Sequence, residues 1–284
     1  MSIATQAIST QPAGHVVDIE PSSGMRPIPV RELWAYRELL YFLVWRDIKV
    51  RYKQTALGAA WAVLQPVMTM AVFTVFLGRL AHVPSDGLPY PLFSFSALVP
   101  WTYFATAVTG GAMSVIGSQQ LISKVYFPRL LVPMAATVTP LVDFAIAMAT
   151  LGVMLAWYHV APGAAVVWIP LLILLAAATA FAVSLWLSAL MVVYRDVRYV
   201  VPFFMQFWMF ATPVAYPASL VPAKWRLLYG LNPMTGVIEG FRWALVGGPA
   251  PGPMVLVSSA AVAVLLVTGL LFFRRLEGTF ADVI

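Results

Sequence analysis

Residues 46–66, RDIKVRYKQTALGAAWAVLQP, join a charged segment directly to an apolar one. Five of the first eight residues are charged, namely Arg46, Asp47, Lys49, Arg51 and Lys53. After them no lysine or arginine occurs until Arg79. Basic residues at such a junction hold a chain at the anionic cytoplasmic surface of a membrane. The stretch therefore predicts a water-facing helix that leads into a first membrane span and fixes its orientation.

The composition is that of a polytopic membrane protein. Apolar residues make up 61% of the 284 residues and charged residues 10%, against roughly 45–50% and about 25% in soluble chains. The net charge of +6 does not indicate a nucleic-acid partner, because the basic residues gather at the ends of apolar segments. The chain has no cysteine, which excludes a disulfide and a thiolate metal site.

Long apolar segments predict an all-α integral membrane protein with six transmembrane helices. A bilayer core needs about 20 apolar residues per helix. We place the spans at residues 59–78, 91–116, 131–158, 166–194, from about 201 onward, and 254–273. Residues 194–200, YRDVRYV, are expected to form a tight charged turn before the fifth span, which Pro213 and Pro217 interrupt. Residues 216–253 are rich in proline and glycine and predict short re-entrant helices in the outer leaflet.

The segments outside the spans have simpler interpretations. Residues 1–30 lack the pattern of a signal peptide and are predicted to be a disordered cytoplasmic tail, and residues 274–284 a second cytoplasmic tail. Residues 31–58 predict an amphipathic interfacial helix and the junction with the first span, and residues 59–273 the transmembrane domain. The apolar positions of the interfacial helix recur at helical spacing: Leu33, Tyr36, Leu40, Leu43 and Val44. A soluble helix packed on a partner protein is the alternative interpretation.

The distribution of lysine and arginine sets the orientation. With the N-terminus inside, seven basic residues precede Gln54 on the inner side. Six more follow there: Lys124, Arg129, Arg195, Arg198, Arg274 and Arg275. The outer segments hold only four of the 17, which are Arg79, Lys224, Arg226 and Arg242. Both termini are therefore predicted to be cytoplasmic.

The sequence carries no pattern that indicates catalysis or metal binding. It contains no GxxxxGK[ST] phosphate loop, no HExxH and no GxSxG. His15, His82 and His159 are too scattered to suggest a metal cluster. We therefore predict no catalytic residue and no metal ligand.

Three ionisable residues fall within apolar segments and are candidates for function. Asp143, near the middle of the third span, costs about 2.5–3.5 kcal/mol on insertion scales. It is either a pathway or relay position, or a carboxyl bonded to a nearby Ser, Thr or backbone group. Glu239 and Arg242 are three residues apart on a predicted helix over 231–246 and are expected to pair. That pair either shapes an exit gate or neutralises charge within the helix.

Aromatic residues are candidates for lining a conduit, because sugar rings pack on aromatic faces. The second and fifth spans supply Trp101, Tyr103, Phe104, Phe207 and Trp208. Packing against lipid is the alternative for these side chains.

Three stretches resemble one family in the same order along the chain. They are RDIKVRYKQTALGAAWAVLQP (46–66), LISKVYFPRLLVP (121–133) and LNPMTGVIEGFRWAL (231–245). Together they resemble the permease subunits of ABC type-2 exporters for polysaccharides and polyol phosphates, which handle O-antigen, capsule, teichoic-acid or galactan polymers.

The resemblance implies a transport subunit rather than an enzyme. Two copies would form a homodimer joined to two copies of a separate ATPase, which binds ATP and Mg, so this chain needs no cofactor. Residues 119–129 would hold the coupling helix, with Leu121, Lys124, Tyr126, Phe127 and Arg129 as contacts. A second candidate for ATPase contact is the turn with Arg195, Asp196 and Arg198. An ordinary interfacial turn and a solvated turn are the alternatives for these two segments.

The same resemblance implies a substrate and a location. The substrate would be a lipid-linked polysaccharide, moved from the inner to the outer leaflet of the bacterial cytoplasmic (inner) membrane. Its pyrophosphate would be attracted to Arg46, Lys49, Arg51 and Lys53, which ordinary anionic membrane lipids would also attract. Two alternatives remain: an ABC type-2 exporter of drugs or lipids, and a membrane-embedded glycan transferase. The transferase would need clustered carboxylates, whereas Asp143 and Glu239 are predicted to lie at different depths.

Overall fold

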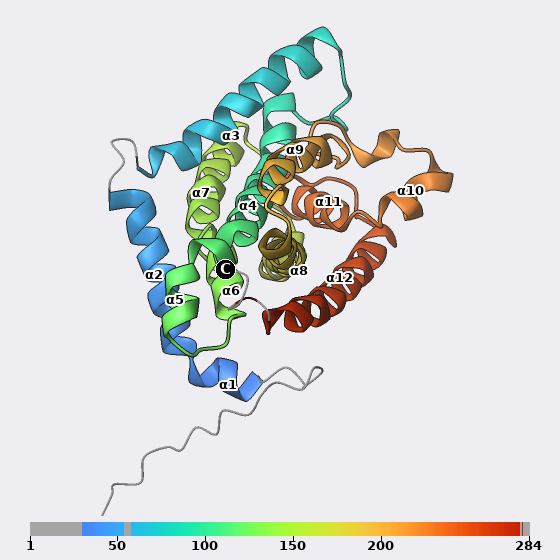
Figure 1. Cartoon of the computed structure of the whole chain (residues 1–284). Coiled ribbons are helices and arrows are strands. Elements are labelled where there is room, and N and C mark those ends of the chain that lie inside the picture. Colours follow the sequence, from blue (N-terminus) through green and yellow to red (C-terminus); the bar gives the residue numbers. More distant parts are fainter. Residues whose placement is uncertain (1–29, 54–57, 279, 281–284) are drawn as a thin grey trace, which may run out of the picture.

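The computed structural model describes residues 30–53, 58–278 and 280, and every regular element in these residues is helical (Figure 1). The long helices are α2 (Arg37–Lys53), α3 (Ala60–Phe73), α4 (Tyr90–Gly117), α7 (Leu141–Trp157), α8 (Ile169–Val193), α9 (Val197–Phe210), α11 (Pro233–Val246) and α12 (Met254–Glu277). The short ones are α1 (Val30–Ala35), η1 (Thr74–Leu80), α5 (Gln119–Lys124), α6 (Leu131–Val138), η2 (Ala164–Trp168), η3 (Ala218–Leu220) and α10 (Ala223–Tyr229).

Within the part of the chain that the structure describes, five helical segments are long and apolar enough to cross a bilayer. They are Ala60–Leu80, Tyr90–Gly117, Leu131–Trp157, Ala164–Val193 and Met254–Glu277. These correspond to five of the six predicted spans. The remaining one, expected from about residue 201, is the 14-residue helix α9. At 1.5 Å per residue α9 is about 21 Å long, which is less than a hydrocarbon core of about 30 Å.

Several helix boundaries differ from the predictions. The third span is not continuous, because a turn at Thr139 and Pro140 separates α6 from α7. Proline has no N–H with which to continue the helical ladder. The predicted turn over residues 194–200 is shorter, since Val197 already begins α9. Helix α12 runs to Glu277, so the first residues of the predicted C-terminal tail continue this helix.

Helix α4 is the centre of the molecule. It packs against α8, α6, α11, α7 and α3. Of an apolar 18-residue stretch within α4, 78% of the residues are buried. The corresponding figure for Ala60–Leu80 is 11%, so α3 and η1 lie at the periphery, as Figure 1 shows. Close approach of α4 to α8 depends on Gly111, where a Cβ would lie 2.2 Å from Ser184 Oγ. Small residues at helix crossings allow such contacts in membrane proteins.

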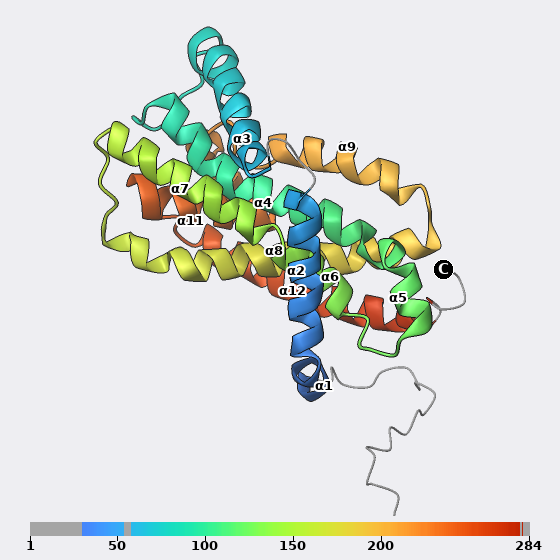
Figure 2. The ribbon, with the colours of Figure 1, turned by 90° about the vertical axis from the view of Figure 1, so that its left-hand side faces the viewer.

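The predicted interfacial helix forms, although a turn at Tyr36 divides it into α1 and α2. The prediction of its apolar face is confirmed. Leu43 is buried, and Leu33, Tyr36, Leu40 and Val44 pack around the same cluster, which includes Phe127, Leu130 and Phe273. In Figure 2, α2 runs across the direction of α4, α7 and α8. That direction fits a helix lying in the membrane surface.

The segment between α9 and α12 contains the short helices expected there. Helix α10 is largely exposed, whereas α11 is buried along almost its whole length. Their re-entrant path in the outer leaflet stays a prediction. The predicted disordered tail over residues 1–30 lies outside the described residues except for Val30, as do residues 54–57 of the predicted junction and positions 279 and 281–284.

Candidate functional site

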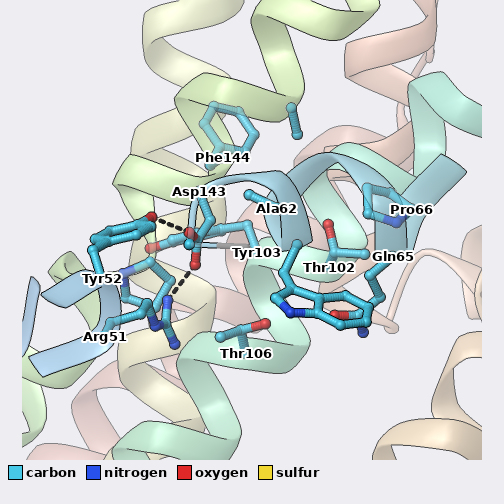
Figure 3. Close-up of a pocket in the computed structure, with 14 residues that line it drawn as sticks. Arg51, Tyr52, Ala62, Gln65, Pro66, Thr102, Tyr103, Thr106, Asp143 and Phe144 are labelled. Carbon is cyan, nitrogen blue, oxygen red and sulfur yellow. Dashed lines mark hydrogen bonds and ion pairs between the residues drawn. The ribbon is translucent and has the colours of Figure 1, made fainter. Parts of the chain in front are cut away.

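Asp143 is the point where helix α2 is tied to the spans. It lies in the first turn of α7 and accepts hydrogen bonds from the Arg51 guanidinium and the Tyr52 hydroxyl, at the end of α2 (Figure 3). We expected either a Ser, Thr or backbone partner or a relay position. The partners instead come from the charged stretch that precedes the first span, which the sequence placed 91 and 92 residues away.

The electrostatics of this cluster explain why the carboxylate is tolerated. The Arg51 and Asp143 side chains are 36% and 27% exposed, so the ion pair is only half-buried. Burial, with a further contribution from Asp143, raises the pKa of Tyr52 to about 12. The Tyr52 hydroxyl therefore stays protonated near neutral pH and remains a donor to Asp143. A carboxylate with two such donors does not face hydrocarbon uncompensated.

Two adjoining cavities lie beside this cluster, and together we call them the α2 groove. The smaller one, about 250 Å³, is bordered by Arg51 and Asp143 and by polar side chains of α3 and α4, among them Gln65, Thr102 and Thr106 (Figure 3). The larger one, about 450 Å³, is bordered by α2, α4 and α6. Both cavities are lined by Arg51, Thr106 and Pro140. The groove therefore runs from beneath α2 to the space between α3 and α4.

The four basic residues predicted to attract a headgroup do not form a single cluster. Arg51 faces Asp143, and Arg46 pairs with the neighbouring Asp47 at 2.9 Å. The Lys49 ammonium lies 5.2 Å from the centroid of the Trp45 ring. Lys49 and Lys53 are both exposed. The charge directed outward from α2 is thus carried mainly by the two lysines.

The predicted coupling segment divides into an exposed part and an anchored part. Lys124 and Tyr126 are exposed, and Leu121 is half-buried. Phe127 is only 4% exposed and belongs to the cluster around Leu43. The backbone N–H of Arg129 donates to Glu277 Oε1 at 3.3 Å, and its guanidinium donates to the Glu277 carbonyl. The segment after α5 is therefore held against α12, with Lys124 and Tyr126 projecting from it.

The structure brings the second predicted contact segment next to the first. Arg195, Asp196 and Arg198 are exposed around the turn between α8 and α9. A cavity of about 490 Å³ is bordered by Arg195 and Arg198 together with Gln119 at the start of α5. Figure 2 shows α5 and the junction of α8 with α9 at the same end of the molecule. The two segments can therefore belong to one surface.

The predicted pairing of Glu239 with Arg242 is confirmed. Arg242 Nη1 lies 2.9 Å from Glu239 Oε1, and the two residues are 4% and 7% exposed. Arg242 Nη2 also donates to the Val214 carbonyl at 2.8 Å. Its guanidinium lies 3.7 Å from the centroid of the Phe93 ring on α4. The pair therefore joins α11 to α4 and to the segment after α9, inside the protein.

The predicted conduit aromatics lie in different environments. Trp101, Tyr103 and Phe104 are buried in α4, and the Tyr103 hydroxyl donates to the Thr137 carbonyl at 3.1 Å. Trp208 packs edge-on against Phe104 with ring centroids 5.1 Å apart. Phe207 is 65% exposed. The five rings do not line one common surface of this chain.

Asn232 links the end of α9 to the start of α11, a role that the sequence interpretation missed. Its side-chain oxygen accepts from Trp208 Nε1 at 3.0 Å and from the Met234 N–H at 3.2 Å. Its nitrogen donates to the Ala211 carbonyl at 3.1 Å and to Thr212 Oγ1 at 2.8 Å. The side chain thereby caps α11 and fixes it to the end of α9. An Asn directly before a Pro at a helix start is the only signal that indicated the cap.

These features define a polytopic helical membrane protein in which α2 crosses the direction of the spans, with a half-buried ion pair at Asp143 and a buried ion pair at Glu239. Comparison with known proteins gives the family: residues 38–246 match the family described as "ABC-2 type transporter". The chain belongs to this family.

Two curated relatives extend the comparison over nearly the whole chain. The O-antigen export system permease protein RfbA of Myxococcus xanthus is 33% identical over 240 residues, which cover 84% of this chain and 91% of that protein. A Klebsiella pneumoniae protein of the same name is 28% identical over 248 residues, covering 87% and 95%.

Proposed function

We propose that this chain is the permease subunit of an ATP-driven exporter for a lipid-linked, O-antigen-like polysaccharide. The observation that carries this proposal is the 33% identity to an O-antigen export permease over 84% of the chain. The multi-span helical structure supports it, since the match extends over four of the five long apolar segments. The polymer moves from the inner to the outer leaflet of the bacterial inner membrane, and both termini are cytoplasmic.

The energy comes from a separate ATPase chain, which binds ATP and Mg. The sequence has no phosphate loop of its own, which supports this division of labour. Two permease and two ATPase chains form the exporter. Lys124 and Tyr126 contact the ATPase together with Arg195 and Arg198, because these side chains are exposed at one end of the molecule. Phe127 and Arg129 anchor the contact surface to α2 and α12.

Transport requires that ATP binding on the partner shifts the permease between two states of different affinity for the polymer. In the proposed homodimer a conduit opens between the two subunits. Phe207 is available to line it because the side chain is exposed, whereas Trp101 and Phe104 support the wall from inside α4. Lys49 and Lys53 attract the phosphate groups of the substrate at the inner surface, each contributing about 1 kcal/mol near an anionic surface.

The alternative of a membrane-embedded transferase gains no support from the positions of Asp143 and Glu239. Asp143 pairs with Arg51 and Glu239 with Arg242, in different parts of the molecule. They do not form a carboxylate pair that could act as acid and base. A drug or lipid exporter of the same family is the remaining alternative, and the following experiment separates it.

The test is depletion of this chain in its host, followed by fractionation of lipid-linked glycan into cytoplasmic and surface pools. The proposal predicts that finished polymer accumulates on its lipid inside while the surface pool empties. Re-expression of the chain should restore the surface pool. Unchanged pools on both sides would contradict glycan export and favour the drug or lipid exporter.

A further inference from the structure

The α2 groove contains two basic and two acidic side chains. Arg46 and Asp47 border the larger cavity, Asp143 borders the smaller one, and Arg51 borders both. Each base lies beside an acid, at 2.9 Å for Arg46 and Asp47. The formal charges of the described residues that border the groove therefore sum to zero, although the exposed surface of α2 is basic. In its balanced charge the groove differs from the exposed surface of α2, where we propose that Lys49 and Lys53 attract the substrate.

The direction and the exposed aromatic side chains of α2 indicate that the groove lies at the level of the lipid headgroups. Helix α2 runs across the direction of the spans (Figure 2), and its exposed Trp34, Tyr41 and Trp45 are of the type that gathers at membrane interfaces. The smaller cavity continues from α2 along α3, where Ala62 and Gln65 border it (Figure 3). A ligand can therefore place a polar group beside α2 and extend an apolar chain along the exposed side chains of α3.

We propose that the α2 groove binds a membrane phospholipid whose headgroup carries both a phosphate and a primary ammonium. The phosphate contacts the Arg51 guanidinium, and the ammonium contacts the Asp143 carboxylate. A guanidinium has five N–H donors and a carboxylate accepts about four hydrogen bonds, so Arg51 and Asp143 can each contact a headgroup in addition to the partners they already have. Arg46 and Asp47 repeat the same pairing of charges along the groove.

The charge balance favours a zwitterion over an anion. An anionic headgroup at Arg51 would also lie near the Asp143 carboxylate, and that repulsion would offset part of the attraction. A phosphate and an ammonium placed beside the pair gain from both contacts. Hydroxyl and amide groups of Thr102, Thr106 and Gln65 offer partners for the neutral ester and glycerol oxygens. The larger cavity, at about 450 Å³, has the volume of a small-molecule site.

This inference is independent of the proposed export function, because it concerns a lipid that stays with the protein. It is tested with the full chain, reconstituted into bilayer discs holding equal amounts of phosphatidylethanolamine, phosphatidylcholine and phosphatidylglycerol with identical acyl chains. The protein is then released into detergent, and the retained lipid is identified by native mass spectrometry. We expect phosphatidylethanolamine to be retained about fivefold over each of the other two, which corresponds to about 1 kcal/mol.

Charge variants in the groove give distinct expected results. Asp143→Asn removes the ammonium partner and leaves the base, so the preference should move from phosphatidylethanolamine to phosphatidylglycerol. Arg51→Gln should lower retention of every phospholipid, while Arg51→Lys keeps a base and should retain the original preference. Arg37→Gln and Glu38→Gln, exposed positions on the same helix outside both cavities, serve as matched controls and should leave the preference unchanged.

A further variant keeps the test decisive if the charge variants do not fold. At Gly110, in the wall of the larger cavity, an added Cβ would meet only the Ala136 carbonyl at 3.9 Å. Gly110→Leu should therefore fill the groove without disturbing the helix and abolish selective retention. Wild-type protein that retains no phospholipid selectively, or prefers phosphatidylglycerol, would overturn the proposal. A preference that survives both Asp143→Asn and Gly110→Leu would place the lipid elsewhere.

Discussion

A single arginine holds three segments of this protein together in its interior. Arg242 pairs with Glu239, donates to the Val214 carbonyl and stacks on Phe93 of α4. The spacing of three residues was enough to predict the ion pair from the sequence. Its burial and its contacts with Phe93 and Val214 were not predictable, because they depend on how distant segments pack around α11.

Removing one member of this pair should cost more than removing both. Arg242→Met leaves the Glu239 carboxylate buried without its partner and should destabilise the protein by about 3–5 kcal/mol. The double variant Glu239→Leu with Arg242→Met removes both charges and should recover much of that loss. The measurement is the thermal unfolding midpoint of the full chain in detergent. Equal losses in the single and double variants would show that the unpaired Glu239 carboxylate is not what destabilises the single variant.

At the scale of helices, the positions of most helices could be predicted from the sequence, but the points where apolar segments are interrupted could not. Apolar length identified five spans, and the periodicity of Leu33, Leu40 and Leu43 identified the packed face of α2. The turn at Pro140 and the short length of α9 were missed, because composition does not show where a helix ends within an apolar segment. The tie between Asp143 and α2 was missed for a related reason. Arg51 was interpreted as a membrane-surface charge, and Tyr52 was given no role.

The packing of α11 on α12 depends on a glycine. A Cβ at Gly236 would lie 2.7 Å from Ser258 Cβ and 3.3 Å from Val255 Cα. Gly236→Ala should therefore separate the two helices and destabilise the protein by about 1–3 kcal/mol. Gly152→Ala is the matched control, since a Cβ there meets nothing within 4 Å. Unfolding midpoints that fall for Gly236→Ala but not for Gly152→Ala would confirm the role of the contact; equal midpoints would contradict it.

Variants in the predicted coupling segment, residues 119–129, can distinguish a loss of ATPase contact from a loss of stability. Lys124→Ala and Tyr126→Ala alter exposed side chains and should weaken stimulation of the ATPase by the permease without lowering the unfolding midpoint. Phe127→Ala empties a buried position and should cost about 3–5 kcal/mol of stability. The checks are ATPase assays of the reassembled complex beside unfolding scans. Full ATPase stimulation with both exposed variants would remove this segment from the proposed contact.

For the whole molecule, the absence of cysteine makes the proposed orientation directly testable. Single cysteines at Ser123, in α5, and at Ser219, in η3, would occupy exposed positions. A membrane-impermeant thiol reagent should label Ser219→Cys in cells whose outer membrane is permeabilised while the inner membrane remains sealed. Ser123→Cys should react only after the inner membrane is permeabilised. The reverse pattern would contradict the orientation inferred from the distribution of lysine and arginine.

The most direct test of the central claim is translocation by the purified exporter. The full chain and its ATPase are reconstituted into liposomes that hold the lipid-linked polysaccharide of the host in the leaflet facing the ATPase. Arrival of the polymer on the opposite leaflet is followed with a glycosidase confined to that side. We predict that the polymer becomes accessible only with ATP and Mg, and that an ATPase variant unable to hydrolyse ATP abolishes this. ATP hydrolysis by the intact complex without any movement of polymer would contradict the proposed function.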